Sequence, residues 1–344
     1  MKIGIFTDTF TQPNGVAKHV QGIAEHLSER HDVTVYTGSG SSDSYKVVNL
    51  PHKRFIFQPE YEQIKAVGVT PDCDVSHAHS PYCTAKLAFK TKAVVTTTHT
   101  IPQHMLSYLH ADVLTPFAWR YLIRFHNRSD HVVCQTKSTE RLFIERGVTK
   151  PTSVISTGLN VDKFKNGNAK AFREKYGIDG EFVLSASRLS AEKRPHWIFK
   201  ACDELGIPCV ATSSGPMKHY LEKKYPSVRF TGALPNGEIC DSYAAASMFA
   251  LTSAVETEGI VVNEAMAARV PVVATALEPV RDSVRDGENG FTFSSYGEFR
   301  QKMKMLWEST SLRDKFTSVA FKEVQEKDYS NVAGRLLSIY ESLV

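Results

Sequence analysis

Short apolar runs alternate along the first half of the chain with stretches in which apolar residues recur every three or four positions. Val16, Val20, Ile23 and Leu27 follow the second pattern, which predicts an amphipathic helix over residues 16–29. Five runs have the length and composition of buried strands: residues 2–8, 33–36, 75–78, 93–97 and 132–135. Repeated strand–helix–strand units are typical of a parallel, doubly wound sheet.

The same pattern starts again in the second half. It predicts a helix near residues 195–205 and a helical segment over residues 315–344. The predicted strands are residues 182–186, 209–212, 228–231, 248–251 and 272–275. Between the halves, Gly158 and several polar residues interrupt the apolar runs, which indicates a hinge. We therefore predict an α/β protein with two Rossmann-like doubly wound domains, residues 1–158 and 159–325, followed by a C-terminal helix at 326–344.

Length and charge support this division and narrow the class of protein. A chain of 344 residues is longer than one hydrophobic core usually serves. The net charge of +4 comes wholly from the first 158 residues, which hold 17 Lys and Arg against 13 Asp and Glu. This excess indicates an anionic surface or substrate, and it is too small to indicate nucleic acid.

Other features indicate a protein that is neither secreted nor membrane-spanning. No apolar run approaches the ~20 residues that cross a bilayer. The first residues, Met1-Lys2-Ile3-Gly4-Ile5, form a short strand pattern and not a signal peptide. The six cysteines are scattered without metal-site spacing, so we expect reduced thiols and a cytoplasmic location.

Glu256 and Glu264 lie on either side of a predicted helix N-terminus. The apolar run 260–266 follows Gly259, so the backbone N–H groups of Gly259, Ile260 and Val261 are available to an anion. One acid can receive sugar hydroxyls, the helix end a phosphate, and the other acid ribose hydroxyls. This arrangement fits a nucleotide sugar, although two glutamates eight residues apart also occur as an ordinary surface pair.

Arg188 and Lys193 follow the predicted strand 182–186, where open α/β sheets bind ligands. Two cations at this place can neutralise a diphosphate and stabilise it as a leaving group. The alternative is a solvated loop in which the cations pair with Glu192.

Three further sites follow strands of the first half. Asn14 and Gly15 join the first strand to the first helix, and Gly15 lets backbone approach a ligand. His79 and His99 end the strands 75–78 and 93–97, although a lone histidine there is more often structural. Asp72 and Asp74 form an Asp-x-Asp pattern, but they precede their strand, so we expect no metal site there.

Taken together, these segments resemble family 4 of the retaining glycosyltransferases, in the two-Rossmann (GT-B) class. The resemblance covers nearly the whole chain. It rests on the Glu-x7-Glu pair of Glu256 and Glu264, on Ser187-Arg188-Leu189 with Glu192-Lys193, and on the strand-end segments His79-Ser80-Pro81 and Thr98-His99-Thr100. The Asn14-Gly15-Val16 loop is similar to that of glucosyl-diacylglycerol synthases and phosphatidylinositol mannosyltransferases. Ser187 and Arg269 depart from the family, which has glycine at both places.

The resemblance implies a division of labour across a cleft between the domains. The first domain would take the acceptor at Asn14, His79 and His99, and the C-terminal helix would return to it. The second would hold a nucleoside-diphosphate sugar. The implied donor site also includes Gly15, Gly215, Gly259, Ile260 and Val261. His99, Arg188, Lys193 and Glu256 would serve catalysis, with no metal and no other cofactor.

The sequence indicates the acceptor less closely than the donor. Basic and aromatic residues interleave at 52–57 and at 117–125, which favours a membrane lipid acceptor, an anionic membrane surface and a peripheral position on the inner face of the cell membrane. For 117–125, packing in the core is an equal alternative. A soluble glycan or small acceptor, a nucleotide-sugar epimerase and a non-catalytic sugar-nucleotide sensor also stay open.

Overall fold

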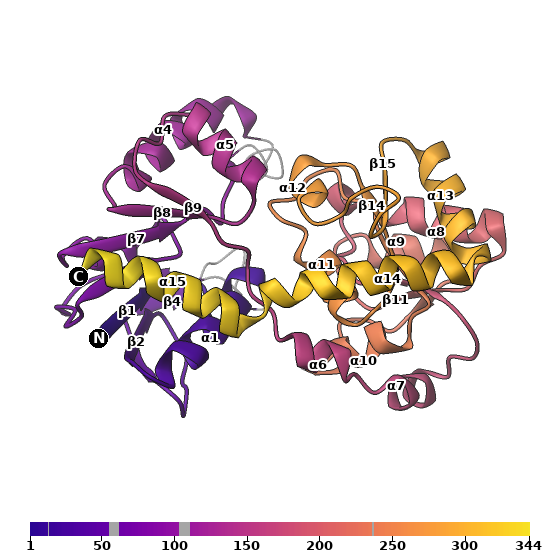
Figure 1. The fold of residues 1–344 in the computed structure, drawn as a ribbon, viewed down its shortest axis with the longest axis horizontal. Helices are drawn as coiled ribbons and strands as arrows, with labels where there is room; N and C mark the ends of the chain where they lie inside the picture. Colours follow the sequence, from indigo (N-terminus) through magenta and orange to yellow (C-terminus); the bar gives the residue numbers. More distant parts are fainter. Residues whose placement is uncertain (13, 55–61, 103–110, 236) are drawn as a thin grey trace. The chain divides into compact units, whose positions relative to one another are not determined.

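The computed structural model describes the chain except for residues 13, 55–61, 103–110 and 236. Its contacts divide these residues into two compact units. Unit 1 comprises Met1–Leu159 and Asp328–Val344, and unit 2 comprises Asn160–Lys327. Each unit is a sheet with helices packed against it (Figure 1).

Unit 1 contains strands β1 (Lys2–Phe6), β2 (Asp32–Thr37), β3 (Lys46–Asn49), β4 (His52–Arg54), β5 (Glu62–Ile64), β6 (Val75–Ala78), β7 (Ala93–Thr97), β8 (His131–Cys134) and β9 (Thr152–Val154). Its helices are α1 (Gly15–Ser28), α2 (Ala85–Ala88), η1 (Asp112–Leu114), α4 (Thr115–His126), α5 (Lys137–Glu145) and α15 (Tyr329–Leu343).

Unit 2 contains strands β10 (Val183–Ser185), β11 (Cys209–Ala211), β12 (Arg229–Phe230), β13 (Met248–Leu251), β14 (Val272–Thr275) and β15 (Phe291–Phe293). Its helices are α6 (Val161–Lys165), α7 (Ala169–Tyr176), η2 (Ala191–Lys193), α8 (Pro195–Leu205), α9 (Lys218–Lys224), α10 (Glu238–Ala245), α11 (Ile260–Ala267), α12 (Glu278–Arg281), α13 (Tyr296–Glu308), α14 (Thr310–Val324) and η3 (Gln325–Lys327).

Both large sheets are parallel and doubly wound, as the strand–helix alternation predicts. The order in unit 1 is β3-β2-β1-β6-β7-β8-β9, and the order in unit 2 is β12-β11-β10-β13-β14-β15. The strand order therefore reverses between β1 and β6 and between β10 and β13. Ligands bind open α/β sheets outside the carboxyl ends of the strands at such switch points.

Successive side chains of β1 point to opposite faces of the sheet of unit 1, and each face packs in a separate hydrophobic core. Ile3 and Ile5 of β1 pack in the core that contains α1 and α15, while Phe6 packs on the other face with α2. Val332 and Tyr340 bring α15 into the first of these cores (Figure 1). The C-terminal segment is therefore part of unit 1, since its apolar face has its partners there.

The secondary structure differs from the sequence prediction at a few ends, and the prediction did not include strands β3, β4, β5, β9 and β15. The strand expected over 2–8 stops at Phe6, which leaves Thr7 and Asp8 in the loop that follows. The helical segment expected over 315–344 is two helices, α14 and α15, separated by η3, because Asp328 is extended and caps Ser330. Arg269 adopts a φ of +58° in the turn after α11, and its guanidinium stacks on Phe321.

Candidate functional site

Loops at the switch point of unit 2 bring together the two cations and one of the two acids that the sequence singles out. Arg188 and Lys193 follow β10, and Glu256 follows β13, its neighbour in the sheet. Lys193 Nζ donates to Glu256 Oε1 at 2.7 Å, with the Glu256 side chain only 10% exposed. Arg188 pairs instead with Glu192 at 3.7 Å and is 48% exposed. The surface pairing considered for this loop therefore occurs at Arg188 and not at Lys193.

Arg194 fastens these two loops to each other, a role the sequence does not reveal. Its Nε and Nη2 atoms donate to the carbonyls of Thr252 and Ser253, each at 2.9 Å. Thr252 Oγ1 donates in return to the carbonyls of Lys193 and Arg194. Arg194 has a left-handed backbone, with a φ of 46°. That strain is offset by the charge-assisted hydrogen bonds, and the loop after β10 is held against the end of β13.

Helix α11 begins one residue after Gly259, as the apolar run predicts. Gly259 has a φ of 81°, a left-handed conformation that favours glycine. Glu264 is 4% exposed in the second turn, and Tyr243 Oη donates to its Oε2 at 3.1 Å and approaches the Val261 carbonyl at 3.2 Å. Tyr243, another residue that the sequence did not indicate, therefore holds the Glu264 carboxylate in place.

Gly215 has a packing reason to be glycine. A Cβ atom there would lie 2.4 Å from the Leu189 carbonyl oxygen, so the loop after β11 can pass the loop after β10 only without a side chain. This close approach places Gly215 beside the Arg188–Lys193 loop, at the strand ends where the nucleotide site is predicted.

Unsatisfied polar groups mark the carboxyl ends of the strands in both units. Among the residues that the structure describes, seven buried side-chain atoms have no hydrogen-bond partner. Four of the seven, Thr9, His79, Ser185 and Ser253, lie at or just after the ends of strands that flank a switch point, and Thr37 and Thr212 lie at the ends of the next strands, β2 and β11. Buried polar groups are normally paired, so these strand ends are candidate positions for a polar ligand.

The loop after β1 places Asn14 and Gly15 at the start of α1. The Asn14 side chain accepts from the Ala17 amide at 2.9 Å, so it serves as the helix N-cap. A Cβ on Gly15 would have no atom within 4 Å. The space in front of Gly15 is therefore open in unit 1 itself.

His79 and His99 meet at the ends of β6 and β7, in a hydrogen-bonded chain that fixes their tautomers. Gln135 accepts from Thr98 Oγ1 and donates through Nε2 to His99 Nδ1 at 2.7 Å. The His99 proton therefore lies on Nε2, which donates to His79 Nδ1 at 3.0 Å. The His79 proton then lies on Nε2, the buried atom without a partner. His79 Nε2 thus carries a buried N–H group without a hydrogen-bond partner among the described residues.

Burial keeps these imidazoles neutral. It lowers the pKa of His79 and of His99 well below the ordinary value, and neighbouring histidines lower both further. His19 of α1 packs edge-on against both rings, and burial lowers its pKa to about 4. His77 has a structural role, since its ring nitrogens bind Tyr340 Oη and Thr97 Oγ1, each at 2.6 Å.

His19, His79 and His99 also come close enough to be considered as metal ligands. One ring nitrogen of each lies within 4.8 Å of the others, a grouping that their sequence spacing does not show. A metal ion requires a free lone pair on each nitrogen. The lone pair of His79 Nδ1 is taken by His99, and that of His19 Nδ1 faces the Gly158 amide at 3.4 Å. The tautomers therefore fit a hydrogen-bonded cluster better than a metal site.

Three carboxylates near the sheet of unit 1 are engaged by other residues of the unit. Asp72 and Asp74 bind the side chain and the amide of Lys2, at the amino ends of β1 and β6. Asp8 follows β1 and is 7% exposed, with both oxygens bound by Thr84. Burial raises the Asp8 pKa to about 6. Asp8 lies just beyond the carboxyl end of β1, because the strand stops at Phe6.

Helix α4 divides the residues 117–125 between the core and the surface. Trp119, Leu122 and Phe125 are buried, whereas Phe117 is 72% and Tyr121 52% exposed. The outer side of α4 carries Arg120 and Arg124. Together with Arg128, which follows the helix, and Arg146, they line a cavity of about 720 Å³. In the other segment, 52–57, residues 55–57 lie outside the described residues. Among the described helices, none has the length and apolar character needed to cross a membrane.

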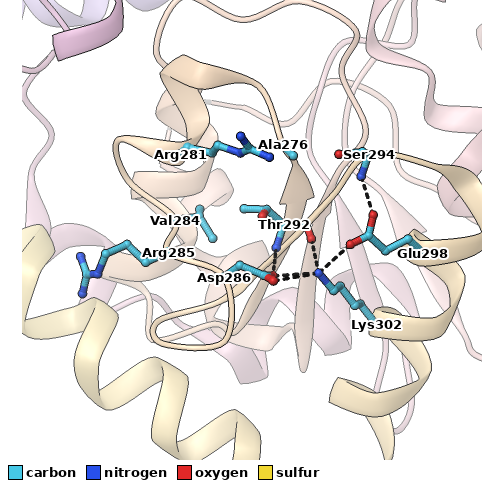
Figure 2. A pocket seen from close by; sticks show the side chains of 9 residues that line it. All are labelled: Ala276, Arg281, Val284, Arg285, Asp286, Thr292, Ser294, Glu298 and Lys302. Atoms are coloured by element: carbon cyan, nitrogen blue, oxygen red, sulfur yellow. Dashed lines mark hydrogen bonds and ion pairs between the residues drawn. The ribbon is translucent and has the colours of Figure 1, made fainter.

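A second cavity, of about 340 Å³, lies in unit 2 between β15 and α13 (Figure 2). Lys302 Nζ reaches Asp286, Glu298 and the Thr292 carbonyl there. These groups satisfy one another, and the cavity does not include the residues of the switch point.

Comparison with known proteins agrees with this arrangement. The chain matches Glycosyltransferase Family 4 over residues 13–163 and Glycosyl transferases group 1 over residues 168–323. It is 28% identical to an alpha-monoglucosyldiacylglycerol synthase of Streptococcus pneumoniae over 87% of this chain and 76% of that protein. It is 24% identical to a GDP-mannose-dependent alpha-mannosyltransferase of Mycobacterium tuberculosis, over 100% and 97% of the two chains.

Solved structures show the same fold at lower identity. Anabaena HepE in complex with UDP-glucose has a TM-score of 0.80 and 20% identity, with 99% of this chain and all of that chain covered. WaaG, a glycosyltransferase involved in lipopolysaccharide biosynthesis, has a TM-score of 0.74 and 14% identity, over 98% and 99% of the two chains. With both halves matched in sequence and both sheets matched in fold, this chain belongs to glycosyltransferase family 4 and has the GT-B architecture.

Proposed function

We propose that this glycosyltransferase moves a hexose, glucose or mannose, from a nucleoside-diphosphate sugar to a hydroxyl group of a membrane lipid, with retention of configuration. In this proposal unit 2 holds the donor and unit 1 the acceptor. The observation that carries it is the Lys193–Glu256 pair at the switch point of unit 2, beside Glu264 and the N-terminus of α11.

The donor would lie along the carboxyl ends of the unit 2 strands. Arg188 and Lys193 would receive the diphosphate, so the donor would replace their present partners Glu192 and Glu256. Glu256, released from Lys193, would orient the sugar hydroxyls, and Glu264, held by Tyr243, would bind the ribose. The buried hydroxyl groups of Ser185, Thr212 and Ser253 would find partners on the nucleotide sugar.

On the acceptor side, His79 would donate through Nε2 to the acceptor oxygen, and His99 would hold its tautomer. Asp8, the carboxylate that follows β1, is bound by Thr84, so we do not propose a covalent sugar–enzyme intermediate. Instead, the C1–oxygen bond to the diphosphate breaks, and its electron pair goes to the phosphate oxygen. The acceptor oxygen bonds C1 on the same face, and its proton passes to that phosphate oxygen.

Two observations support a lipid acceptor. The relatives include the Streptococcus pneumoniae protein named alpha-monoglucosyldiacylglycerol synthase. Helix α4 exposes Phe117 and Tyr121 beside Arg120 and Arg124, a combination suited to an anionic membrane interface. We expect a peripheral protein on the inner face of the cell membrane.

The test is a donor screen followed by product analysis. UDP-glucose, UDP-galactose, GDP-mannose and GDP-glucose are compared by thermal shift, and the stabilising donor is incubated with diacylglycerol, phosphatidylinositol or a soluble disaccharide. We expect one glycolipid product with an α-linkage by NMR. Donor hydrolysis or isomerisation without an acceptor would indicate an epimerase, and binding without turnover would indicate a sensor. Transfer to the disaccharide alone would replace the lipid by a soluble acceptor.

A further inference from the structure

Lys327, at the end of η3, lies in a polar cluster that reaches the donor-side loop of unit 2. Its Nζ atom donates to Asn263 Oδ1 at 2.8 Å and to Ser283 Oγ at 2.6 Å. Asn263 is fully buried in α11, and Ser283 is 8% exposed after α12. A lysine is therefore used to join two elements that are far from it in the sequence.

The cluster continues from Asn263 to the loop before α11. Asn263 Nδ2 donates to Glu258 Oε1 at 3.2 Å, and the Glu258 side chain is 4% exposed. Burial lowers the pKa of Lys327, while Glu258 is the carboxylate that raises it most. The positive charge of Lys327 thus compensates a buried carboxylate, a group that is costly to leave without a partner.

Glu258 lies between the two parts of the donor site. Glu256 precedes it by two residues, and Gly259, in its left-handed conformation, starts α11 directly after it. The direction of the loop at Glu258 therefore sets where the Glu256 carboxylate lies relative to the first amides of α11. A loop that turns at a glycine needs such an anchor, since the glycine itself adds no side-chain contact.

We propose that Lys327 is a positioning residue for the donor site, which acts through Asn263 and Glu258 to hold the loop 256–259 and the start of α11. The proposal rests on the assignment of Glu256 and Glu264 to the donor. Lys327 is also the last residue of unit 2 before the chain enters unit 1 at Asp328. The anchor of the donor loop is therefore carried by the segment that connects the two units.

The alternative is that Lys327 only stabilises unit 2. Five variants separate the two roles. Lys327→Met removes the charge and the donors, and Ser283→Ala removes one partner of Lys327 but leaves the Asn263 branch. Lys302→Met removes a comparable lysine, which reaches Asp286 and Glu298 away from α11 (Figure 2). Lys327→Gln is a milder substitution for the case in which Lys327→Met does not fold, and Lys327→Arg tests rescue.

The first measurement is amide hydrogen exchange without ligand. We expect Lys327→Met to speed exchange in peptides covering 256–267 about tenfold, the size expected for the loss of one charge-assisted hydrogen bond. Exchange in β10 and α8 should keep its normal rate, and Lys327→Arg should restore the normal pattern. Ser283→Ala and Lys302→Met should leave 256–267 unchanged, even where they lower the melting temperature.

The second measurement is calorimetric binding of UDP and GDP, with Glu264→Ala as a reference. For whichever of UDP and GDP binds, we expect Lys327→Met to weaken the affinity about tenfold. We expect Ser283→Ala to leave that affinity unchanged. Uniformly faster exchange or unchanged exchange at 256–267 in Lys327→Met would overturn the positioning role. If Glu264→Ala binds nucleotide as the unmodified protein does, the donor-site assignment fails instead, and the exchange result decides for Lys327 independently.

Discussion

At the scale of single residues, the proposed donor side pairs its cations with carboxylates of unit 2. Lys193 holds Glu256 at 2.7 Å, and Arg188 holds Glu192 at 3.7 Å. These contacts keep the cations at the strand ends without the repulsion that unpaired charges would cause. A diphosphate offers more charge than one carboxylate, so it can displace them.

Arg188→Ala and Lys193→Ala should each lower kcat/KM strongly. Losing one cation that stabilises the departing diphosphate costs about 2–4 kcal/mol of transition-state stabilisation. Lys193→Gln removes the charge while keeping a donor for Glu256, and it should behave like the alanine variant. Lys170→Ala, at an exposed ion pair of α7, should leave the rate unchanged. Near-normal turnover in both Arg188→Ala and Lys193→Ala would remove the cations from the mechanism.

Substitution of Glu256 and substitution of Glu264 should change different quantities, the rate and the donor affinity. Glu264→Ala should mainly weaken donor binding, since Glu264 lies within α11 and Tyr243 holds it towards the proposed ribose position. Glu256→Ala should mainly lower kcat, since Glu256 lies in the loop beside Lys193 and faces the proposed sugar. Binding isotherms and initial rates for both variants test this. An unchanged affinity together with an unchanged rate in either variant would contradict its place in the donor site.

At the scale of elements, the two sides of helix α4 differ in burial. Trp119 and Phe125 pack inward, which secures the helix to unit 1, and Arg120, Arg124 and Phe117 are left outside. Arginines beside an exposed aromatic ring are a combination that suits a membrane interface.

Arg120→Gln with Arg124→Gln should reduce binding to anionic vesicles. Each basic residue near an anionic leaflet contributes about 1 kcal/mol, so the pair should weaken the partition about thirtyfold. Lys170→Gln with Lys304→Gln removes the same charge from exposed positions of unit 2 and is the matched control. Co-sedimentation with phosphatidylglycerol and phosphatidylcholine vesicles at low salt measures both. Equal loss in the two double variants would show that net charge, and not α4, directs binding.

At the scale of the whole molecule, ionisable groups are distributed unevenly between the units. Eleven of the thirteen histidines fall within the first 158 residues. Burial lowers the pKa of His19 to about 4 and of His126 to about 3, and those of His77, His79 and His99 also fall well below the ordinary value. Unit 1 therefore contains a set of buried, neutral imidazoles that become protonated at low pH.

Unit 1 should lose stability as the pH falls below 6.5. Between the unfolded pKa of 6.5 and the lowered folded values, the unfolded chain binds more protons, so its free energy falls by up to about 1.4 kcal/mol per pKa unit for each histidine. Asp8 acts oppositely, since its folded pKa of about 6 lies above 3.8 and its protonation favours the folded chain in that window. One carboxyl does not offset five histidines.

Urea titrations at about pH 7.5 and 5.5, with hydrogen exchange to assign each transition to a unit, measure this effect. Asp8→Asn removes the compensating group and should make the loss with acid larger. A stability of unit 1 that stays constant between the two pH values would contradict the burial of neutral histidines.

Transfer should survive removal of divalent cations. Arg188 and Lys193 supply the positive charge at the strand ends, while Asp72 and Asp74 are bound to Lys2 at the opposite ends of their strands. Turnover after exhaustive chelation should equal that of untreated protein. Loss of activity that magnesium or manganese restores would contradict the cation account, and restoration by zinc alone would indicate a metal at His19, His79 and His99.

Much of the fold follows from the sequence because it depends on local patterns. Strand and helix periodicity predicts both sheets, and Gly259 followed by an apolar run predicts the start of α11 at Ile260. Pro195 opens α8 where its fixed φ and missing N–H are tolerated. The ends of strands follow less directly from the sequence. The side chains of Thr7 and Asp8 continue the pattern of β1, although the strand ends at Phe6.

From the sequence, the candidate site can be predicted only as a set of residues that follow strands. Arg188, Lys193, Glu256, His79 and His99 follow apolar runs, and parallel topology alone brings such positions to one edge of a sheet. Which of them touch is decided by the fold: Lys193 meets Glu256, Arg188 turns to Glu192, and His99 fixes the proton of His79 through Gln135. Contacts between residues 63 apart or 36 apart leave no trace in local periodicity.

The sequence by itself therefore determined the class of fold and the chemical types at the strand ends, because both follow from hydrophobic periodicity and short segments of chain. Only the tertiary structure decided the roles of Arg194, Tyr243 and Lys327, which act through contacts with distant segments. It also decided which aromatic residues of α4 face outward, because burial depends on the neighbours that pack against each side of a helix.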